Sequence, residues 1–296
     1  MRTLELRDGR VLPVVGQGTW QMGVRAGARE AEVAALKLGL DLGMTLIDTA
    51  EMYADGGAEQ VVARAIEGRR DHVFVVSKVL PSNASRAGTI TACERSLRRL
   101  RTDRIDLYLL HWESEQHPLE ETLAAFVELE RAGKIRSFGV SNFDEPLMAR
   151  TLAAPDGAAC CCNQLLYNLA RRGIEWRLLP DLQRRAILVM AYSPLDEARL
   201  ELELERAAPT RAIERSATTR RRVLHAVAQR HGATAAQIAL AWTIRTSDVV
   251  TIPKAADPNH VRQNAAAADL TLSPADLAEL DAAWPPPRGA TALEMI

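Results

Sequence analysis

The apolar run Val73-Phe74-Val75-Val76-Ser77-Lys78 is followed by the periodic segment Arg86–Leu100 and by a second apolar run, Ile105-Asp106-Leu107-Tyr108-Leu109-Leu110-His111. Both runs have the length of a strand, and neither alternates cleanly between apolar and polar residues. That pattern is typical of parallel strands in a sheet covered by helices. The three segments together predict a strand–helix–strand unit, with Lys78 and His111 at the carboxyl ends of its strands.

The same alternation continues in both directions along the chain. Strand-like runs are predicted at Pro13–Gly18, Thr45–Asp48, Val73–Lys78, Ile105–His111, Ile135–Val140, Cys160–Gln164, Ile187–Tyr192 and Val249–Pro253. Helical periodicity is found at Glu30–Leu42, Glu59–Glu67, Arg86–Leu100, Leu119–Ala132, Glu145–Leu152, Ile174–Arg184, Arg220–Gln229 with Thr234–Ile244, and Asn259–Ala267. Eight such units predict an α/β fold in which parallel strands close into a (β/α)8 TIM barrel.

The main alternative fold is a doubly wound open sheet. Such a sheet is expected to carry a glycine-rich fingerprint of the form GxGxxG after its first strand. The corresponding stretch here is Gly16-Gln17-Gly18-Thr19-Trp20, which does not match that spacing. The closed barrel is therefore the preferred prediction.

Segments outside the eight units predict additions to the barrel. Thr3–Leu6 and Val11–Val14, joined through Asp8-Gly9, predict a β-hairpin that plugs one barrel end. Near the C-terminus, Ser273-Pro274 predicts the start of an extra helix, which Pro285–Pro287 ends before a short tail. Because no linker-like composition divides the chain, residues 1–296 are predicted to form a single domain.

The composition limits the class of protein. Among 296 residues, 37 Lys and Arg face 38 Asp and Glu, a net charge of −1, which argues against nucleic-acid binding. No apolar run reaches the ~18–20 residues of a membrane span, and the charged start Met1–Arg10 does not resemble a signal peptide. The adjacent residues Cys160, Cys161 and Cys162 suit neither a disulfide framework nor a metal site. We therefore expect a cytoplasmic protein that binds no metal and no membrane.

Candidate functional side chains stand at the ends of the predicted strands, where barrel enzymes place their chemistry. Lys78 follows an apolar strand, so its ammonium group needs a carboxylate partner, and Asp48 on the neighbouring strand can supply one. Taken alone, this pair is better explained as a structural ion pair at the barrel rim. The strand-end positions are Trp20, Asp48, Lys78, His111, Ser141-Asn142, Gln164, Tyr192 and Lys254.

Tyr53, shortly after Asp48, adds a possible chemistry to this pair. A phenol has a pKa of ~10, and an adjacent cation is expected to lower it. Asp48 holding Lys78, Lys78 acidifying Tyr53 and Tyr53 giving up a proton would form a general-acid relay. A single histidine such as His111 is most often structural, but beside this relay it could orient a carbonyl oxygen.

Several motifs of the chain resemble, in order and context, those of the aldo-keto reductases. The resemblance extends from Gly16 to Lys254, and its details are similar to small bacterial members, including methylglyoxal-reductase-like proteins. It implies a monomeric (β/α)8 oxidoreductase that moves hydride from NADPH to the carbonyl of small aldehydes, ketones or dicarbonyls. The motifs are Leu46-Ile47-Asp48-Thr49-Ala50-Glu51-Met52-Tyr53, Val76-Ser77-Lys78, Asp106-Leu107-Tyr108-Leu109-Leu110-His111, Lys78–Ser85 and Tyr192-Ser193-Pro194-Leu195.

The resemblance also implies which residues have roles. Asp48, Tyr53, Lys78 and His111 match the catalytic positions. Ser141, Asn142 and Gln164 match positions that hydrogen-bond the nicotinamide carboxamide, and Tyr192 matches the ring stacked on the nicotinamide. The implied cofactor residues are Gly18, Thr19, Trp20, Asp48, Ser141, Asn142, Gln164, Tyr192, Ser193, Pro194, Leu195, Ile252, Pro253, Lys254, Ala255, His260, Gln263 and Asn264. The implied substrate contacts are Trp20, Met52, Tyr53, His111 and Trp112, with the tail after Pro287.

Two positions depart from the family's pattern where the adenosine 2′-phosphate would bind. Ala255 stands where many relatives have Ser or Thr, and His260 stands where many have Arg. A histidine is expected to hold the phosphate more weakly and in a pH-dependent way, so NADH could also bind, although less well than NADPH. The short segment Trp112–His117 predicts a shallow substrate pocket. The stretch Leu200–Arg215 predicts either a solvated helix or loop, or a flap over the cofactor.

Two other functions would use the same residues differently. A Schiff-base aldolase or lyase would explain Lys78, but it gives Gln164 and Tyr192 no role; trapping with borohydride would identify it. A non-catalytic, nicotinamide-binding regulatory subunit is the other alternative. The intact set of Asp48, Tyr53, Lys78 and His111 argues against that alternative, and turnover of any aldehyde would exclude it.

Overall fold

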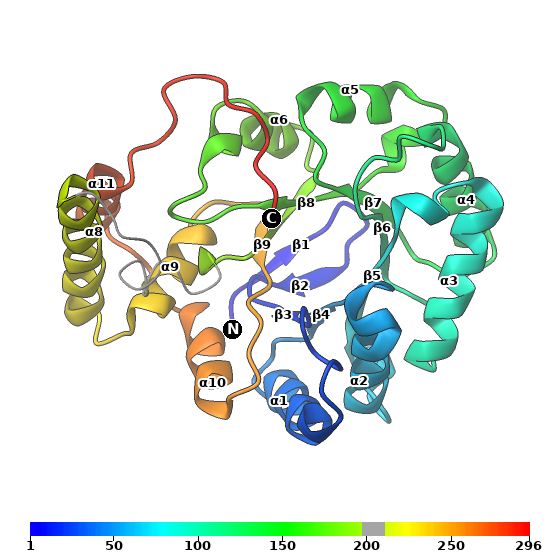
Figure 1. The fold of residues 1–296 in the computed structure, drawn as a ribbon, viewed down its shortest axis with the longest axis horizontal. Coiled ribbons are helices and arrows are strands. Elements are labelled where there is room, and N and C mark those ends of the chain that lie inside the picture. Colours follow the sequence, from blue (N-terminus) through cyan, green and yellow to red (C-terminus); the bar gives the residue numbers. More distant parts are fainter. Residues whose placement is uncertain (197–210) are drawn as a thin grey trace.

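A computed structural model describes residues 1–196 and 211–296 of the chain (Figure 1). In these residues eight parallel strands form one sheet, and neighbours in the sheet follow the order of the sequence. The sheet closes because Val15, just before the first of these strands, bridges in parallel to Thr251 of the last. The predicted (β/α)8 barrel is confirmed. The strands are β3 (Gln17–Gly18), β4 (Leu46–Asp48), β5 (Phe74–Val79), β6 (Leu107–Leu110), β7 (Phe138–Ser141), β8 (Cys162–Leu166), β9 (Leu188–Tyr192) and β10 (Val249–Thr251).

Helices surround this barrel (Figure 1). Most begin and end within a few residues of the predicted segments, but α8 starts at Arg211, nine residues before the predicted Arg220, and α6 starts four residues later than Ile174. A separate 3-10 turn, η6 (Gly173–Glu175), occupies that interval. Of the segment Leu200–Arg215, residues 200–210 lie outside the described residues. The helices in the described ranges are α1 (Arg29–Asp41), α2 (Gly57–Ala65), α3 (Arg86–Leu100), α4 (Leu119–Arg131), α5 (Glu145–Ala153), α6 (Leu178–Arg184), α8 (Arg211–Arg230), α9 (Ala235–Thr243), α10 (Pro258–Ala267) and α11 (Pro274–Ala283).

The N-terminal hairpin consists of β1 (Thr3–Glu5) and β2 (Val11–Pro13), which pair antiparallel. Leu12 is fully buried and packs with side chains that fill the barrel interior. Arg10, in the turn, donates hydrogen bonds to Asp106 O at 3.0 Å and Ser137 Oγ at 2.8 Å, which lie just before β6 and β7. The predicted plug is therefore confirmed and covers the amino ends of the strands. The carboxyl ends of the strands are not covered by this hairpin.

Two predicted helix starts are also confirmed. Asp257 caps α10 by accepting a hydrogen bond from Asn259 N at 2.7 Å, and Pro258 is the first helical residue. Ser273 caps α11 in the same way through Asp276 N at 3.2 Å. Within residues 1–196 and 211–296, no helix combines the length and apolar character needed to cross a membrane.

Candidate active site

Lys78, Asp48 and Tyr53 meet at the carboxyl end of the barrel. Lys78 lies in β5, and Asp48 is the last residue of the adjacent strand β4. The Lys78 Nζ donates hydrogen bonds to Asp48 Oδ2 at 2.8 Å, to the carbonyl oxygen of Thr49 at 2.9 Å and to Tyr53 OH at 3.2 Å. Lys78 is fully buried and Asp48 is 2% exposed. Because all three ammonium hydrogens have acceptors, the position of this buried charge is tightly fixed.

Tyr53 begins the short turn η2 (Tyr53–Gly56) between β4 and α2. The three residues that follow it all have left-handed backbone conformations, with φ of +52° at Ala54, +50° at Asp55 and +85° at Gly56. Such a run is unfavourable unless its surroundings impose it. A Cβ atom on Gly56 would collide with the side chain of Arg99 from α3. The turn places the Tyr53 ring beside Lys78, whose Nζ lies 4.8 Å from the ring centroid.

The protonation states of this group follow from burial and charge. Burial raises the pKa of Tyr53, and the neighbouring Lys78 only partly offsets that effect. The expectation that Lys78 brings the Tyr53 pKa below its ordinary value is therefore wrong for this structure, because the desolvation of a phenolate outweighs the attraction of the cation. Burial opposes the charge of Lys78, but Asp48 and Tyr53 more than compensate, so the pKa of Lys78 is raised. Near neutral pH the phenol is protonated and the ammonium group is charged.

His111 follows β6 and lies beside this group. Its ring centroid is 5.9 Å from that of Tyr53 and 4.6 Å from that of Trp112. Burial, and then the charge of Lys78, lower the pKa of His111 to about 2, so its imidazole is neutral. Its Nδ1 is buried without a hydrogen-bond partner among the described residues. A neutral imidazole provides one donor and one acceptor, which suits contact with a polar, uncharged group such as a carbonyl.

A hydrogen-bonded chain connects Asp48 to the ends of three further strands. Gln164 Nε2 donates to Asp48 Oδ1 at 2.8 Å, and Ser141 Oγ donates to the carbonyl oxygen of Gln164 at 3.0 Å. Asn142 Nδ2 donates to Ser141 Oγ at 3.1 Å, and its Oδ1 accepts from Tyr192 OH at 2.9 Å. Ser141, Asn142, Gln164 and Tyr192, predicted as one binding region, therefore lie together at the strand ends.

The remaining residues predicted near the nicotinamide also border this region. Thr19 Oγ1 donates to the Asp48 carbonyl oxygen at 2.9 Å, and a Cβ atom on Gly18 would lie 2.6 Å from the carbonyl oxygen of Ile252. Gly18 is thus required where β3 passes β10. After β9, Ser193 adopts a φ of +47°, and its carbonyl oxygen accepts from Asn168 Nδ2 at 2.9 Å. Pro194 is buried, whereas Leu195 is partly buried and packs on the main core.

The segment after β10 forms a more open part of the predicted cofactor region. Pro253 and Ile252 are buried, but Lys254 and His260 are exposed and make no side-chain hydrogen bond or ion pair with described residues. Ala255 packs partly buried against a small core cluster. Farther along α10, the Gln263 carbonyl oxygen accepts from Gln237 Nε2 at 3.2 Å, and Asn264 is buried.

Aromatic side chains border the Tyr53 hydroxyl. Trp20 is 49% exposed, and its ring centroid lies 4.9 Å from that of Tyr53. Trp112 is also partly exposed, whereas Met52 is partly buried and packs on the main core. The C-terminal tail returns over the barrel, so that the C-terminus lies near the middle of the view in Figure 1. Arg171 Nη1 pairs with Glu294 of this tail at 2.7 Å.

Two buried carboxylates behind these residues were not predicted from the sequence. Glu51 Oε1 accepts from Leu80 N at 2.8 Å and from Asn83 Nδ2 at 2.9 Å, which fixes the loop after β5. Glu59, fully buried in α2, accepts from Ser77 Oγ at 2.7 Å. One signal was available for Glu59. Ser77 precedes Lys78 in a strand and so faces the helices, where a buried hydroxyl needs a partner.

The cysteines take no part in this region. All four are free thiols, and burial raises the pKa of Cys93 and of Cys160 to about 12. These thiols are protonated and unreactive at neutral pH. In the part of the chain that the structure describes, no group of three or more His, Cys, Asp or Glu side chains could hold a metal ion.

Comparison with known proteins gives a consistent result. The family model for the aldo/keto reductase family matches residues 14–285. The chain is 52% identical over 286 residues to the methylglyoxal reductase YeaE of Escherichia coli K12, covering 96% of this chain and 95% of that protein. Among solved structures, an aldo-keto reductase from Klebsiella pneumoniae in complex with NADPH is 48% identical, covers both chains completely and gives a TM-score of 0.90. The thermostable aldo-keto reductase Tm1743, in complex with the inhibitor epalrestat, is 37% identical with a TM-score of 0.84, covering 96% of this chain and all of that one.

Proposed function

The chain belongs to the aldo/keto reductase family, and from this premise we propose that it uses NADPH to reduce the carbonyl group of small aldehydes, ketones or dicarbonyls, with Tyr53 as the general acid. The observation that carries the proposal is the set of contacts from Lys78 Nζ to Asp48 Oδ2 at 2.8 Å and to Tyr53 OH at 3.2 Å. The E. coli relative is named a methylglyoxal reductase. Methylglyoxal is therefore the substrate that we propose first.

When bound, NADPH supplies the hydride that reduces the carbonyl carbon. The Tyr53 hydroxyl then gives its proton to the carbonyl oxygen, and the product is an alcohol. Negative charge develops on the Tyr53 oxygen as the proton leaves, and the Lys78 ammonium group, which already contacts that oxygen, stabilises it. Asp48 holds Lys78 charged and in place. His111, neutral because its pKa is lowered to about 2, can donate one hydrogen bond to the carbonyl oxygen.

The residues at the strand ends fit this cofactor. Ser141, Asn142 and Gln164 offer hydroxyl and amide groups for the carboxamide, and the partly buried ring of Tyr192 offers an apolar plane for the nicotinamide. At the other end, Lys254 and His260 are exposed cationic or ionisable side chains without described partners. We assign them to the phosphate groups of the cofactor, which need such donors.

The charge of Lys78 disfavours the Schiff-base alternative. An amine attacks a carbonyl only when deprotonated, and lyases lower the pKa of their lysine to achieve this. Here Asp48 and Tyr53 raise the pKa of Lys78 instead. All three of its hydrogens are also engaged in hydrogen bonds.

The test is a panel of aldehydes, ketones and dicarbonyls, including methylglyoxal, assayed with NADPH and with NADH. We expect turnover of several small carbonyl compounds, with NADPH preferred. Absence of turnover with every compound would contradict the proposal. Covalent trapping of Lys78 by borohydride in the presence of a substrate would replace it with the lyase alternative.

We further propose that the enzyme acts as a monomer in the cytoplasm, where its four free thiols would remain reduced. Size-exclusion chromatography with light scattering tests whether the protein is a monomer. A mass near 32.5 kDa is expected, and a stable dimer would contradict it.

A further inference from the structure

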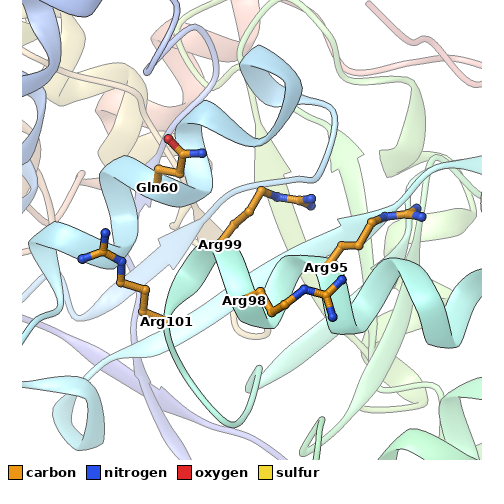
Figure 2. A pocket seen from close by; sticks show the side chains of 5 residues that line it. All are labelled: Gln60, Arg95, Arg98, Arg99 and Arg101. Carbon is orange, nitrogen blue, oxygen red and sulfur yellow. The ribbon is translucent and has the colours of Figure 1, made fainter.

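A hollow lined mainly by arginines lies on the outer surface of the barrel, between α2 and α3. Its volume is about 440 Å³, and its lining consists of Gln60, Arg95, Arg98, Arg99 and Arg101 (Figure 2). None of these residues belongs to the candidate active site. The four arginines come from the C-terminal half of α3 and the residue that follows it, and Gln60 stands on α2.

Two of these arginines are held by buried carboxylates. Arg99 Nε pairs with Glu59 at 2.5 Å, and Arg95 lies 3.6 Å from Glu51. Glu59 is fully buried and Glu51 nearly so. Because a buried carboxylate is costly to leave without its partner, these ion pairs fix where Arg95 and Arg99 lie. They form an ordered base for the hollow.

The other two arginines have no such partner. Arg98 and Arg101 are exposed and form no ion pair or side-chain hydrogen bond with any residue in the described ranges. The nearby Glu94 pairs with Lys134 at 2.5 Å, which is the main cause of its lowered pKa, and the charge of Arg98 contributes less. With two carboxylates against four guanidinium groups, the hollow keeps two positive charges in excess.

The spacing of these charges is unfavourable in the absence of an anion. Arg95 and Arg98 stand three residues apart on α3, and like charges at that interval on a helix repel. Arg101, in a left-handed conformation directly after the helix, adds a further cation at the same end. The dipole of α3 favours cations in its last turn, which accounts for Arg98 or Arg99 individually. It does not account for four arginines around one depression.

We propose that this hollow binds the phosphate group of a small phosphorylated molecule, at a site separate from the candidate active site. Guanidinium groups match phosphate oxygens through paired, charge-assisted hydrogen bonds. A volume of about 440 Å³ lies in the range of small-molecule sites, so it can hold a phosphate together with a small organic group. Arg98 and Arg101 supply the excess charge, and Arg95 and Arg99 supply fixed donors.

The test is calorimetric titration of the protein saturated with NADP+, at constant ionic strength in a buffer without phosphate. The probes are pyrophosphate, inorganic phosphate and glycerol 3-phosphate. We expect one site for pyrophosphate, and at least a tenfold weaker affinity in the double variant Arg98→Gln/Arg101→Gln, because each lost cation removes charge-assisted hydrogen bonds. Glutamine retains good helix propensity, so α3 should persist.

The matched control is Arg131→Gln/Arg222→Gln, which removes two exposed arginines from α4 and α8. It should bind pyrophosphate like the unmodified protein, and both variants should keep the KM for NADPH. Stronger binding of glycerol 3-phosphate than of inorganic phosphate would identify an organic ester as the ligand, and the reverse order would identify free phosphate. Equal affinities in the two double variants, or no binding up to about 10 mM, would overturn the proposal.

Discussion

His111 and His260 stand at opposite ends of the proposed cofactor site and differ in their exposure and in their contacts. His111 is 8% exposed, lies against Tyr53 and Trp112, and has its pKa lowered to about 2 by burial and by Lys78. His260 lies on the exposed start of α10 and makes no hydrogen bond or ion pair with a described side chain. His111 therefore stays neutral near neutral pH, whereas His260 is open to solvent.

This difference extends to the regions around the two residues. Around Tyr53, buried groups satisfy one another through hydrogen bonds from Lys78, Asp48 and Gln164. Around Lys254 and His260, polar side chains face solvent. The reacting end is therefore organised before any ligand arrives, and the phosphate end is left to be completed by its ligand. The rate of carbonyl reduction should therefore depend on the region around Tyr53. The affinity for the cofactor, and the preference for NADPH over NADH, should depend on the region around Lys254 and His260.

The strongest test of this division is Tyr53→Phe. It removes only the hydroxyl, so carbonyl reduction should fall by ~10²–10⁴-fold, as for the loss of a general acid, while NADPH binding stays nearly unchanged. Steady-state kinetics and fluorescence titration of NADPH measure the two quantities. A variant that keeps more than about a tenth of the kcat, where chemistry limits turnover, would show that Tyr53 is not the acid.

His111 should reveal itself through the pH dependence of stability. Its pKa in the folded protein, about 2, lies below the ~6.5 of an unfolded chain. Below about pH 6.5 this histidine is therefore protonated in the unfolded state but not in the folded state. The free energy of unfolding falls as the pH decreases further. At pH 5 the loss should reach roughly 2 kcal/mol, from ~1.4 kcal/mol for each pH unit.

Urea unfolding of the unmodified protein and of His111→Gln, at pH 7.5 and pH 5, measures that loss. The variant lacks the titrating group, so its free energy of unfolding should fall less on acidification. Parallel losses in the two proteins would mean that His111 accepts a proton in the folded state.

His260→Arg tests the open end with a smaller effect. A guanidinium group is always charged and can bind phosphate through two parallel hydrogen bonds, which an imidazole cannot do. The variant should bind NADPH more tightly by about 1–2 kcal/mol. NADH lacks the 2′-phosphate, so its affinity should be nearly the same in the variant and in the unmodified protein.

Fluorescence titrations of NADPH and of NADH with the variant and with the unmodified protein decide this point. An unchanged NADPH affinity in His260→Arg would remove His260 from the site and leave Lys254 or Arg262 as the source of charge.

Removal of metal ions or of reducing agent should have no effect on activity. Neither end of the proposed site needs a metal, so dialysis against a chelator should leave the rate of carbonyl reduction unchanged, and omission of reducing agent should do the same. A reversible loss of activity that added metal restores would contradict the roles assigned to both regions.

The barrel and the grouping of Asp48, Tyr53, Lys78 and His111 were predictable because both follow from order along the chain. Strand ends of a parallel barrel meet at one face, so residues at those ends must be neighbours. The structure confirms that these four side chains lie together, and their catalytic roles remain predictions.

Properties that depend on distant packing were not predictable. The direction of the Tyr53 pKa shift depends on how much of the phenol other elements bury. At Gly56, the left-handed turn after Tyr53 leaves no room for a Cβ atom beside Arg99, a residue more than 40 positions away. No local pattern reports such contacts, although the Gly56-Gly57 pair marks a place where the backbone has unusual freedom.

The burial of Lys78 has a practical consequence for chemical labelling. The sequence contains lysine only at positions 37, 78, 134 and 254. Lys78 is fully buried and charged, so amine-reactive reagents cannot reach it, and Lys134 is partly shielded by its ion pair with Glu94. Lys37 and Lys254 are exposed. A mass-spectrometric footprint of acetylation would therefore depend chiefly on these two side chains, with Lys37 as the internal reference and protection of Lys254 as a direct reading of where the phosphate end of the cofactor binds.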